Sequence, residues 1–320
     1  IVQGGAFFLP YCHTPSYVAS PQTVLVAGAD PHDEQRAIYA ERWGLSEDNV
    51  YTDYRDMLKS EKPDIVSICT TARHRPQIMV DVARAGAKAI WSEKPISLSL
   101  EEADTMVSVC DELGVKVAVN TARRYNPYFA ETRRRIDAGE LGDILQVNVH
   151  GQCGLSHNGS HAIDALRYLA KGGNVEWVFG EMESDEAAAG ENDLMGNGYL
   201  AFDNGIRGFL RGMSCGVANW ETDVIGTEGR ARTIYNCADT EFTHLADGGS
   251  RGRGVPVMGK IPLPAKVEGM GITIIRDLIE SVDTDLQPRA SIYDGRQALE
   301  IAIALRESHR GGGVRVNLPL

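Results

Sequence analysis

The charged pair Glu93-Lys94, followed by Pro95, ends the apolar run Ala89-Ile90-Trp91 and is the strongest chemical signal in the sequence. Pro95 disfavours helical geometry at Lys94 and keeps it extended at the carboxyl end of a predicted strand, where open α/β sheets bind ligands. The lysine ammonium can there donate to a substrate hydroxyl and stabilise a developing alkoxide, while Glu93 orients neighbouring groups. Taken alone, the pair can also be a solvated ion pair in a turn.

A glycine-containing segment near the start of the chain indicates a dinucleotide site. Doubly wound sheets bind the pyrophosphate at the first strand–helix turn, where glycines let the helix N-terminus come close. Gly4, Gly5 and Ala6 lie in that turn, although the glycines are adjacent and not spaced as in G-x-G-x-x-G. Asp30 ends the next strand and is predicted to bind the ribose hydroxyls, which favours NAD over NADP because a 2′-phosphate would be repelled. The alternative role of Asp30 is a helix cap ahead of Pro31.

From residue 23 to residue 119, β-branched runs alternate with helical patterns, which predicts a parallel βαβ series. The predicted strands are Thr23–Ala29, Asn49–Thr52, Asp64–Cys69, Ala87–Trp91 and Lys116–Val119, and the predicted helices are Asp33–Trp43, Tyr54–Ser60, Pro76–Ala85 and Leu100–Leu113. The run Thr23–Ala29 is continuously apolar, as in strands covered on both faces. Ser99 and Glu102 form a capping box, and Gly114 ends the helix that follows them.

After Asn120 the predicted strands follow one another without helices between them, which indicates antiparallel pairing in an α+β domain. These strands are Ile144–Gln152, Val175–Glu183, Gly198–Phe202, Ile206–Met213, Glu221–Gly226, Ala231–Asn236 and Val314–Leu318. The predicted helices are Pro127–Ala138, His161–Ala170, Gly271–Val282 and Asp294–His309. The turn Asp203-Asn204-Gly205 predicts a hairpin with positive φ at both central positions.

The composition of the chain argues against several classes of binding partner. With 32 Lys+Arg against 44 Asp+Glu the net charge is −12, so nucleic acid would be repelled. The apolar stretches are far shorter than the roughly 20 residues of a transmembrane helix, and no membrane partner is expected. The six cysteines have no C-x-x-C pair, which argues against a disulfide framework and structural zinc and predicts a reducing, cytoplasmic setting. They are Cys12, Cys69, Cys110, Cys153, Cys215 and Cys237.

Motifs on either side of Lys94 give the sequence a family resemblance. The loop Thr70-Thr71-Ala72-Arg73-His74 precedes Glu93-Lys94-Pro95, and Asn120-Thr121-Ala122-Arg123-Arg124-Tyr125-Asn126-Pro127 follows it. Gly139-Glu140-Leu141-Gly142 and Ile225-Gly226-Thr227-Glu228-Gly229 occur further along. With these motifs the sequence resembles the Gfo/Idh/MocA family of nicotinamide-dependent oxidoreductases over nearly its whole length.

The resemblance implies a fold and a separate function for each of two domains. It implies an α/β Rossmann domain with a parallel doubly wound sheet, residues 1–120, which binds the dinucleotide. An α+β domain with a large, mostly antiparallel open sheet, residues 121–320, would bind substrate and mediate oligomers. The open sheet face commonly forms dimers or tetramers in the family, so a homodimer or homotetramer is expected.

The resemblance also implies an activity. The expected enzyme transfers a hydride between NAD and a secondary alcohol or ketone of a sugar, inositol or related polyol. Besides Asp30 and the glycine segment, Thr70, Thr71, His74, Glu93 and Lys94 are expected to contact the cofactor. The residues expected to contact substrate are Lys94, Arg124, Tyr125, His157 and His161. The alternatives are a redox-neutral glycosidase that uses NAD catalytically and a non-catalytic ligand sensor on the same fold.

A second family motif, Asp-x-Gly-x-His-x-x-Asp, occurs here as His157-Asn158-Gly159-Ser160-His161-Ala162-Ile163-Asp164. The resemblance implies that His161 accepts the hydroxyl proton as the hydride leaves, while Lys94 stabilises the alkoxide. Asp164 is expected to have a buried, hydrogen-bonding role. His150, His157, His161 and Asp164 could alternatively be metal ligands, but the expectation is that no metal binds. The remaining histidines His13, His32, His244 and His309 are expected at the surface or at helix caps.

His157 replaces the first aspartate of the motif. A neighbouring carboxylate would favour the imidazolium form of His161 and His157 cannot, so His161 is expected to be neutral more readily here. The alternative is that His157 contacts substrate or structure without affecting this proton. His157→Asp should therefore shift the acid limb of the pH profile of kcat/KM to higher pH. An unchanged acid limb in that variant would refute the expectation.

Overall fold

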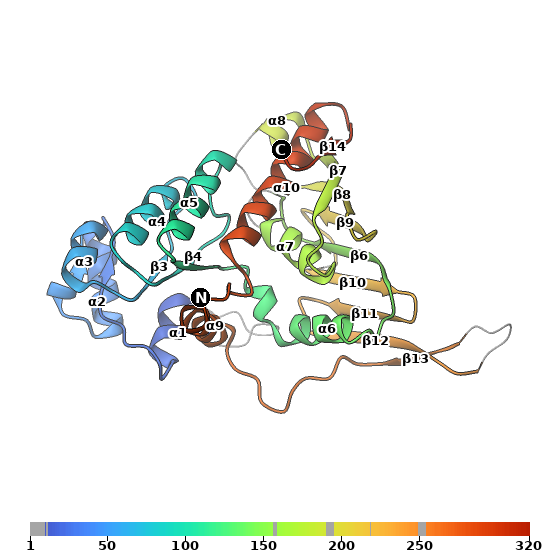
Figure 1. The fold of residues 1–320 in the computed structure, drawn as a ribbon, viewed down its shortest axis with the longest axis horizontal. Coiled ribbons are helices and arrows are strands. Elements are labelled where there is room, and N and C mark those ends of the chain that lie inside the picture. The colour runs from blue at the N-terminus through green and yellow to red at the C-terminus, as the bar shows by residue number, and fades with distance from the viewer. Residues whose placement is uncertain (1–9, 11, 156–158, 190–194, 218, 249–253) are drawn as a thin grey trace. The chain divides into compact units, whose positions relative to one another are not determined.

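The computed structural model in Figure 1 describes residues 10, 12–155, 159–189, 195–217, 219–248 and 254–320. These residues form two compact units. The first unit holds the described residues up to Asn120 together with Gly269–Tyr293, and the second holds Thr121–Glu268 and Asp294–Leu320. The change of unit after Asn120 coincides with the division into 1–120 and 121–320. Residues 269–293, however, return to the first unit, which that division does not include.

Short parallel strands form the framework of the first unit. β3 (Ile65–Ile68), β4 (Ala89–Ser92) and β5 (Lys116–Val119) form one sheet in that order, and β1 (Gly28–Ala29) pairs with β2 (Val50–Tyr51) in another. All these pairs are parallel, so the predicted parallel series is confirmed. Every residue of β4 and β5 is buried, as expected of strands covered on both faces.

The helices of the first unit keep the predicted order, with two additions, α1 (His13–Ala19) and the short helix η1 (Glu47–Asn49). The others are α2 (Asp33–Trp43), α3 (Tyr54–Glu61), α4 (Arg75–Arg84), α5 (Leu100–Glu112) and α9 (Met270–Thr284). Ser99 Oγ accepts a hydrogen bond from the Glu102 amide at 3.2 Å, which caps α5 as predicted. Gly114, with a φ of 69°, follows the end of this helix.

Among the described residues, strand pairing covers only the end of the predicted run Thr23–Ala29. Only Gly28 and Ala29 pair, with Val50 and Tyr51. Val24 is 83% exposed, so the described residues do not cover this run on both faces. Residues 1–9 lie outside the described residues, so a longer strand over Thr23–Ala29 that is covered on both faces stays a prediction.

The segment 269–293 joins the first unit through contacts with β5. Lys116 Nζ donates to the Asp285 carboxylate at 2.5 Å and to the Asp285 carbonyl at 3.0 Å. The Val119 amide donates to the Ala290 carbonyl at 2.7 Å, and Ala118 forms an antiparallel bridge with Ser291. The segment therefore supplies hydrogen-bond partners to the edge of the parallel sheet, which a sequence read in order cannot reveal.

A nine-stranded sheet dominates the second unit, in the order β13-β12-β11-β10-β6-β9-β8-β7-β14. β6 and β9 are parallel and the other neighbours are antiparallel, so the predicted large, mostly antiparallel sheet is confirmed. The strands are β6 (Ile144–Gly151), β7 (Val175–Met182), β8 (Gly196–Phe202), β9 (Arg207–Gly212), β10 (Glu221–Gly226), β11 (Gly229–Ile234), β12 (Asp239–Ala246), β13 (Val255–Gly259) and β14 (Val316–Asn317). β12 and β13, which extend one edge of the sheet, were not predicted from the sequence.

Helices cover one face of this sheet, as Figure 1 shows for α7 and α10. The helices of the unit are η2 (Ala122–Tyr125), α6 (Pro127–Asp137), α7 (Gly159–Leu169), α8 (Asp185–Ala189) and α10 (Ile292–Arg310). A Cβ at Gly180 would lie 2.2 Å from the Leu305 carbonyl oxygen, and one at Gly208 would lie 2.7 Å from a methyl group of Leu166. Glycine at these two strand positions therefore lets α10 and α7 pack directly on the sheet.

The turn Asp203-Asn204-Gly205 joins β8 and β9 as predicted, but its geometry differs. Gly205 has a φ of 85°, whereas Asn204 is not among the described residues with positive φ. The Asn204 side chain instead accepts from the Ile206 amide at 3.2 Å and donates to the Ala170 carbonyl at 2.9 Å. The prediction of two positive φ values is wrong because backbone bonds from the Gly205 amide to the Phe202 carbonyl and from the Phe202 amide to the Ile206 carbonyl close a longer loop, which needs only Gly205 in the left-handed region. None of the helices in the described ranges is long and apolar enough to cross a membrane.

Candidate active site

Glu93 and Lys94 directly follow β4, at the carboxyl edge of the parallel sheet. Glu93 Oε1 accepts from Asn120 Nδ2 at 2.7 Å and from His13 Nε2 at 3.3 Å, and Oε2 accepts from the Lys94 amide at 3.2 Å. The Glu93 amide donates to the Ile68 carbonyl at 3.0 Å. Glu93 is thus fixed by α1, by the residue after β5 and by its own neighbour, and the backbone that carries Lys94 is fixed with it.

His13 lies inside the first unit, which corrects its expected place at the surface. It is 8% exposed, and its ring stacks on Trp91 with centroids 3.8 Å apart. His13 Nδ1 lies 2.8 Å from Ser67 Oγ, while Nε2 faces Glu93. The sequence contains no short-range signal for this contact, because His13 and Glu93 are 80 positions apart.

Burial and the neighbouring charge have opposite effects on the pKa values of His13 and Glu93. Burial lowers the pKa of His13, but hydrogen bonds with Cys69 and Glu93 outweigh it and raise the pKa to about 9. Burial raises the pKa of Glu93, but its hydrogen bonds to His13 and Asn120 and the charge on His13 outweigh it and lower the pKa to about 2. The pair is therefore an imidazolium and a carboxylate over the neutral range of pH.

The residues predicted to contact the cofactor lie at strand ends of the same unit. Asp30 follows β1, is half-buried and accepts from the His32 amide at 2.9 Å. The N-cap residue of α2 is His32, so this bond forms a turn ahead of the helix and is not the predicted helix cap. Thr70, Thr71 and His74 are exposed in the loop between β3 and α4. Gly4, Gly5 and Ala6 lie outside the described residues. The exposed hydroxyls at one strand end and the acceptor Asp30 at another have the chemistry that a dinucleotide requires.

In the second unit, Arg124 belongs to a buried ion network. Its Nε and Nη2 donate to the Asp164 carboxylate at 2.7 to 3.0 Å, and Nη2 also donates to Asp294 at 2.9 Å. Asp294 accepts from Arg167 as well, at 3.1 Å. Burial lowers the pKa of Arg124, but the two carboxylates outweigh it and raise the pKa above its ordinary value. The expected buried, hydrogen-bonding role of Asp164, which is 0% exposed, is confirmed.

His161 lies in the first turn of α7, next to an aromatic ring that the sequence analysis missed. The rings of His161 and Trp220 meet edge to face, with centroids 6.0 Å apart and planes at 80°. Arg123 packs on Trp220 with its guanidinium carbon 3.5 Å from the ring centroid. Tyr125 is buried, at 3% exposed, and His157 lies outside the described residues. His161, Trp220 and Arg123 therefore form one contiguous group.

The alternative of a metal site requires that acidic and imidazole side chains come together. Asp164 is bound to Arg124, and His150 Nε2 lies 3.2 Å from Glu221. Within the described ranges, histidine, cysteine, aspartate and glutamate side chains form no group of three that could hold a metal ion.

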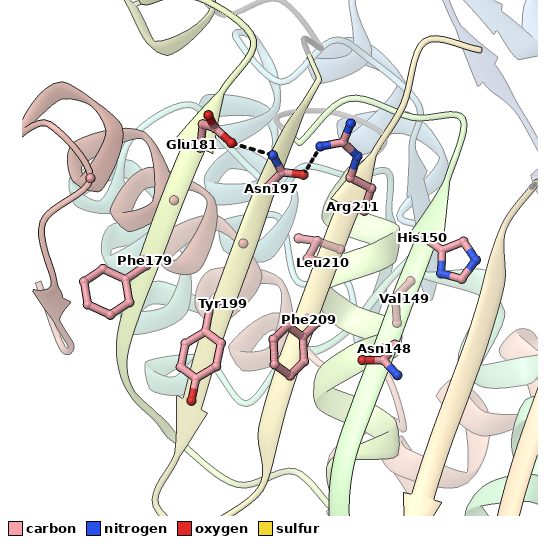
Figure 2. Close-up of a pocket in the computed structure, with 13 residues that line it drawn as sticks. Asn148, Val149, His150, Phe179, Glu181, Asn197, Tyr199, Phe209, Leu210 and Arg211 are labelled. Atoms are coloured by element: carbon pink, nitrogen blue, oxygen red, sulfur yellow. Dashed lines mark hydrogen bonds between the residues drawn. The ribbon is translucent and has the colours of Figure 1, made fainter. Parts of the chain in front are cut away.

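A shallow pocket lies on the sheet face of the second unit and not at the predicted site residues (Figure 2). Phe179, Tyr199 and Phe209 line it from three neighbouring strands. Glu181, Asn197 and Arg211 form a hydrogen-bonded row beside them. Alternation along the strands places these side chains on the face opposite to the core.

Family models match both parts of the chain. Residues 2–121 match the model described as "Oxidoreductase family, NAD-binding Rossmann fold", and residues 133–318 match "Oxidoreductase family, C-terminal alpha/beta domain". The chain belongs to the Gfo/Idh/MocA oxidoreductase family. The resemblance carried by the Glu93-Lys94-Pro95 motif is thereby confirmed, as are the Rossmann fold of the first domain and the sheet-rich second domain.

Several relatives of this Gfo/Idh/MocA chain are dehydrogenases. The scyllo-inositol 2-dehydrogenase (NAD(+)) of Bacillus subtilis is 28% identical, with 95% of this chain and 92% of the relative covered. The D-apiose dehydrogenase of Paraburkholderia graminis is 24% identical, with 90% and 81% covered. The structure of a levoglucosan dehydrogenase with NADH and levoglucosan has a TM-score of 0.80 at 21% identity, with 99% and 98% covered, and shares the fold. Distant relatives are thus NAD-dependent dehydrogenases of sugars and inositols.

The ion pair of His13 and Glu93 predicts a pH dependence of stability. The contribution of His13 is complete below its ordinary pKa of 6.5 and is lost as the pH rises towards 9. The contribution of Glu93 is complete above its ordinary pKa of 4.5 and is lost as the pH falls towards 2. We expect His13→Gln to lower the free energy of unfolding most between pH 4.5 and 6.5, by on the order of 2 kcal/mol, and progressively less towards pH 9.

Urea unfolding at a series of pH values measures this difference. His32→Gln is the matched control, because His32 is exposed at the start of α2 and makes no side-chain cap. A loss in His13→Gln that is the same at pH 5.5 and pH 9 would contradict the ion pair.

Proposed function

We propose that this protein is an NAD-dependent oxidoreductase that transfers a hydride between nicotinamide and a secondary alcohol or ketone of a sugar, inositol or related polyol. The observation that carries the proposal is the fixing of Glu93 by His13, Asn120 and the Lys94 amide at the carboxyl end of β4. Such an arrangement orders the backbone at a lysine that belongs to the family motif. Dehydrogenases of inositols, D-apiose and levoglucosan among the relatives support the substrate class.

The residues of the first unit fit the dinucleotide. Asp30 would accept hydrogen bonds from the ribose hydroxyls, and its negative charge favours NAD over NADP. Thr70, Thr71, His74 and Glu93 would lie towards the nicotinamide half, and Gly4, Gly5 and Ala6 would approach the pyrophosphate. When bound, the nicotinamide supplies the hydride acceptor for oxidation or the hydride donor for reduction.

Lys94 and His161 divide the remaining chemistry between them. The Lys94 ammonium donates a hydrogen bond to the reacting oxygen and stabilises the negative charge that develops there. His161 accepts the hydroxyl proton when the alcohol is oxidised and returns it when the ketone is reduced. His157, next to this group in the motif, would affect the protonation of His161 or contact the substrate.

The ion network beside α7 favours a positioning role for Arg124. Its donors engage Asp164 and Asp294, and Asp164 lies one helical turn after His161 on α7. Arg124 then acts by holding the helix that carries His161, and not by the substrate contact that the family motif implies. Tyr125, also predicted as a substrate contact, is buried beside it in η2.

We also propose that the sheet face in Figure 2 joins two copies of the chain in a homodimer or homotetramer. Phe179 and Phe209 are each 40% exposed, and Tyr199 lies between them with its ring centroid 5.1 Å from that of Phe209. Large aromatic side chains that gather on an exposed face are typical of subunit interfaces.

Substitution of Lys94 tests the activity. Lys94→Ala should lower kcat by at least roughly 100-fold, because the alkoxide loses its cationic donor. The Kd for NADH should stay nearly unchanged, because Lys94 is placed for the reacting hydroxyl and not for the adenosine half of the cofactor. Turnover is followed by nicotinamide absorbance with scyllo-inositol, myo-inositol, D-apiose and levoglucosan. Lys88→Ala is the control, since Lys88 pairs with Asp64 before β4 begins.

The same assay separates the alternatives. If Lys94→Ala keeps wild-type turnover, Lys94 has no part in the reaction. If free sugar forms without net NADH, the activity is that of a redox-neutral glycosidase, and if NADH binds but none of the compounds reacts, the ligand sensor is favoured.

Substitution of Phe209 tests the subunit contact. Phe209→Glu should convert the oligomer to monomer, because burying an unpaired carboxylate at a subunit interface is costly. Light scattering after size-exclusion chromatography measures the mass, with Leu113→Glu as the control because Leu113 is exposed on the first unit. An unchanged mass for Phe209→Glu would place the interface elsewhere.

A further inference from the structure

Arg123 differs from the other buried arginines of the second unit in what surrounds it. It is 8% exposed, and its Nη2 donates to Asn236 Oδ1 at 3.3 Å. Its Nε is buried and has no hydrogen-bond acceptor among the described residues. The aromatic face of Trp220 packs on the guanidinium, whose carbon lies 3.5 Å from the ring centroid.

Arg124, the next residue, has carboxylate partners that Arg123 lacks. Arg124 places Nε and Nη2 side-on against Asp164, and Arg167 likewise faces Asp294. Burial lowers the pKa of Arg123 to about 10, and the groups whose charge opposes this are the thiols Cys237 and Cys153, with no carboxylate among them. A buried guanidinium without a counter-ion costs several kcal/mol on the usual scale, and a bound anion would remove that cost.

The backbone around Arg123 is held in an unfavourable conformation. Trp220 has a φ of 54°, and Asn236 and Cys237 have φ values of 54° and 65°. All three residues face Arg123, through the ring contact, the hydrogen bond and the nearby thiol. Positive φ at residues other than glycine costs free energy and is concentrated at functional sites. Asn236 and Cys237 form, with Tyr235 at a φ of 48°, the turn between β11 and β12, so hairpin geometry accounts for two of the three values and Trp220 is the strained residue beside Arg123.

The group also lies beside the proposed proton acceptor. Trp220 contacts Arg123 with its face and His161 with its edge, so the guanidinium and the imidazole pack against one aromatic ring. A ligand held by Arg123 would be presented to the reacting group of the same unit.

We propose that Arg123 binds a carboxylate of the substrate, so that the polyol oxidised or reduced by this protein is a sugar acid. This inference rests on the proposed function and adds the substrate class. A planar carboxylate matches the fork geometry of a guanidinium and supplies the charge that the described surroundings of Arg123 lack. The contact of Arg124 with Asp164 is an internal example of the same geometry.

Matched pairs of neutral and acidic sugars test the proposal: D-glucose with D-glucuronate, and D-galactose with D-galacturonate. The acid of at least one pair should bind more tightly in calorimetry and have the higher kcat/KM with NAD. Arg123→Gln should weaken the acid roughly 10- to 150-fold, the usual range for a hydrogen bond to a charged group, and leave the neutral sugar nearly unaffected. Arg123→Lys should recover part of the loss, because it keeps the charge but not the fork.

Two controls test whether a folding defect, and not a lost contact, weakens binding in Arg123→Gln. Arg134→Gln removes an exposed arginine of α6 that pairs with Glu131 and Glu140, and should leave both sugars unaffected. The Kd for NADH should be unchanged in Arg123→Gln, because Arg123 is not among the residues assigned to the nucleotide, and the described ones among these belong to the first unit.

The outcomes separate this inference from the proposed function. Turnover of neutral sugars without preference for the acid, or an equal loss of both sugars in Arg123→Gln, overturns the carboxylate site and leaves the oxidoreductase standing. If NADH does not bind and neither sugar reacts, the oxidoreductase fails. Calorimetry then still decides the carboxylate site, since acid binding that Arg123→Gln abolishes would support it and equal binding of acid and neutral sugar would overturn it.

Discussion

The first unit depends on the hydrogen bonds that converge on one half-buried carboxylate, that of Glu93. Glu93 connects α1, through His13, with the end of β4 and with Asn120 after β5. Each of these segments belongs to a different part of the chain, and the charges on Glu93 and His13 compensate each other away from water. Because removing one member would leave the other charged and buried, the contact constrains the whole carboxyl edge of the sheet. The family lysine is attached to that edge.

The buried arginines of the second unit have two kinds of surroundings. Arg124 and Arg167 share the carboxylates of Asp164 and Asp294, which stiffens the start of α7 and the start of α10. Arg123 instead has an aromatic face, one amide oxygen and two thiols. A buried arginine whose carboxylate partner lies within the protein contributes to the structure. A buried arginine that lacks such an anion is available to a ligand.

Net charge and local charge have different consequences in this protein. The net charge of −12 works against any anionic ligand at long range. Dinucleotides are anionic, and so is the proposed substrate, so their binding must depend on fixed groups at close range. Lys94 and Arg123 are such groups, and they belong to different units of the chain. Short-range hydrogen bonds to charged groups in partly dry surroundings outweigh the screened repulsion of distant surface carboxylates.

The sequence by itself determined most of the order of helices and strands after residue 30, although not α8, β12 and β13, because hydrophobic period, capping residues and glycine stops act within a few positions. α5, with Ser99 at its start and Gly114 after its end, is an example. The motif around Lys94 likewise identified the family, since it depends on neighbouring residues. Tertiary structure alone decided the burial of His13 against Glu93, the return of residues 269–293 to β5, and the different surroundings of Arg123 and Arg124. These features arise from contacts between segments tens to hundreds of positions apart. Local patterns along the chain therefore cannot predict them.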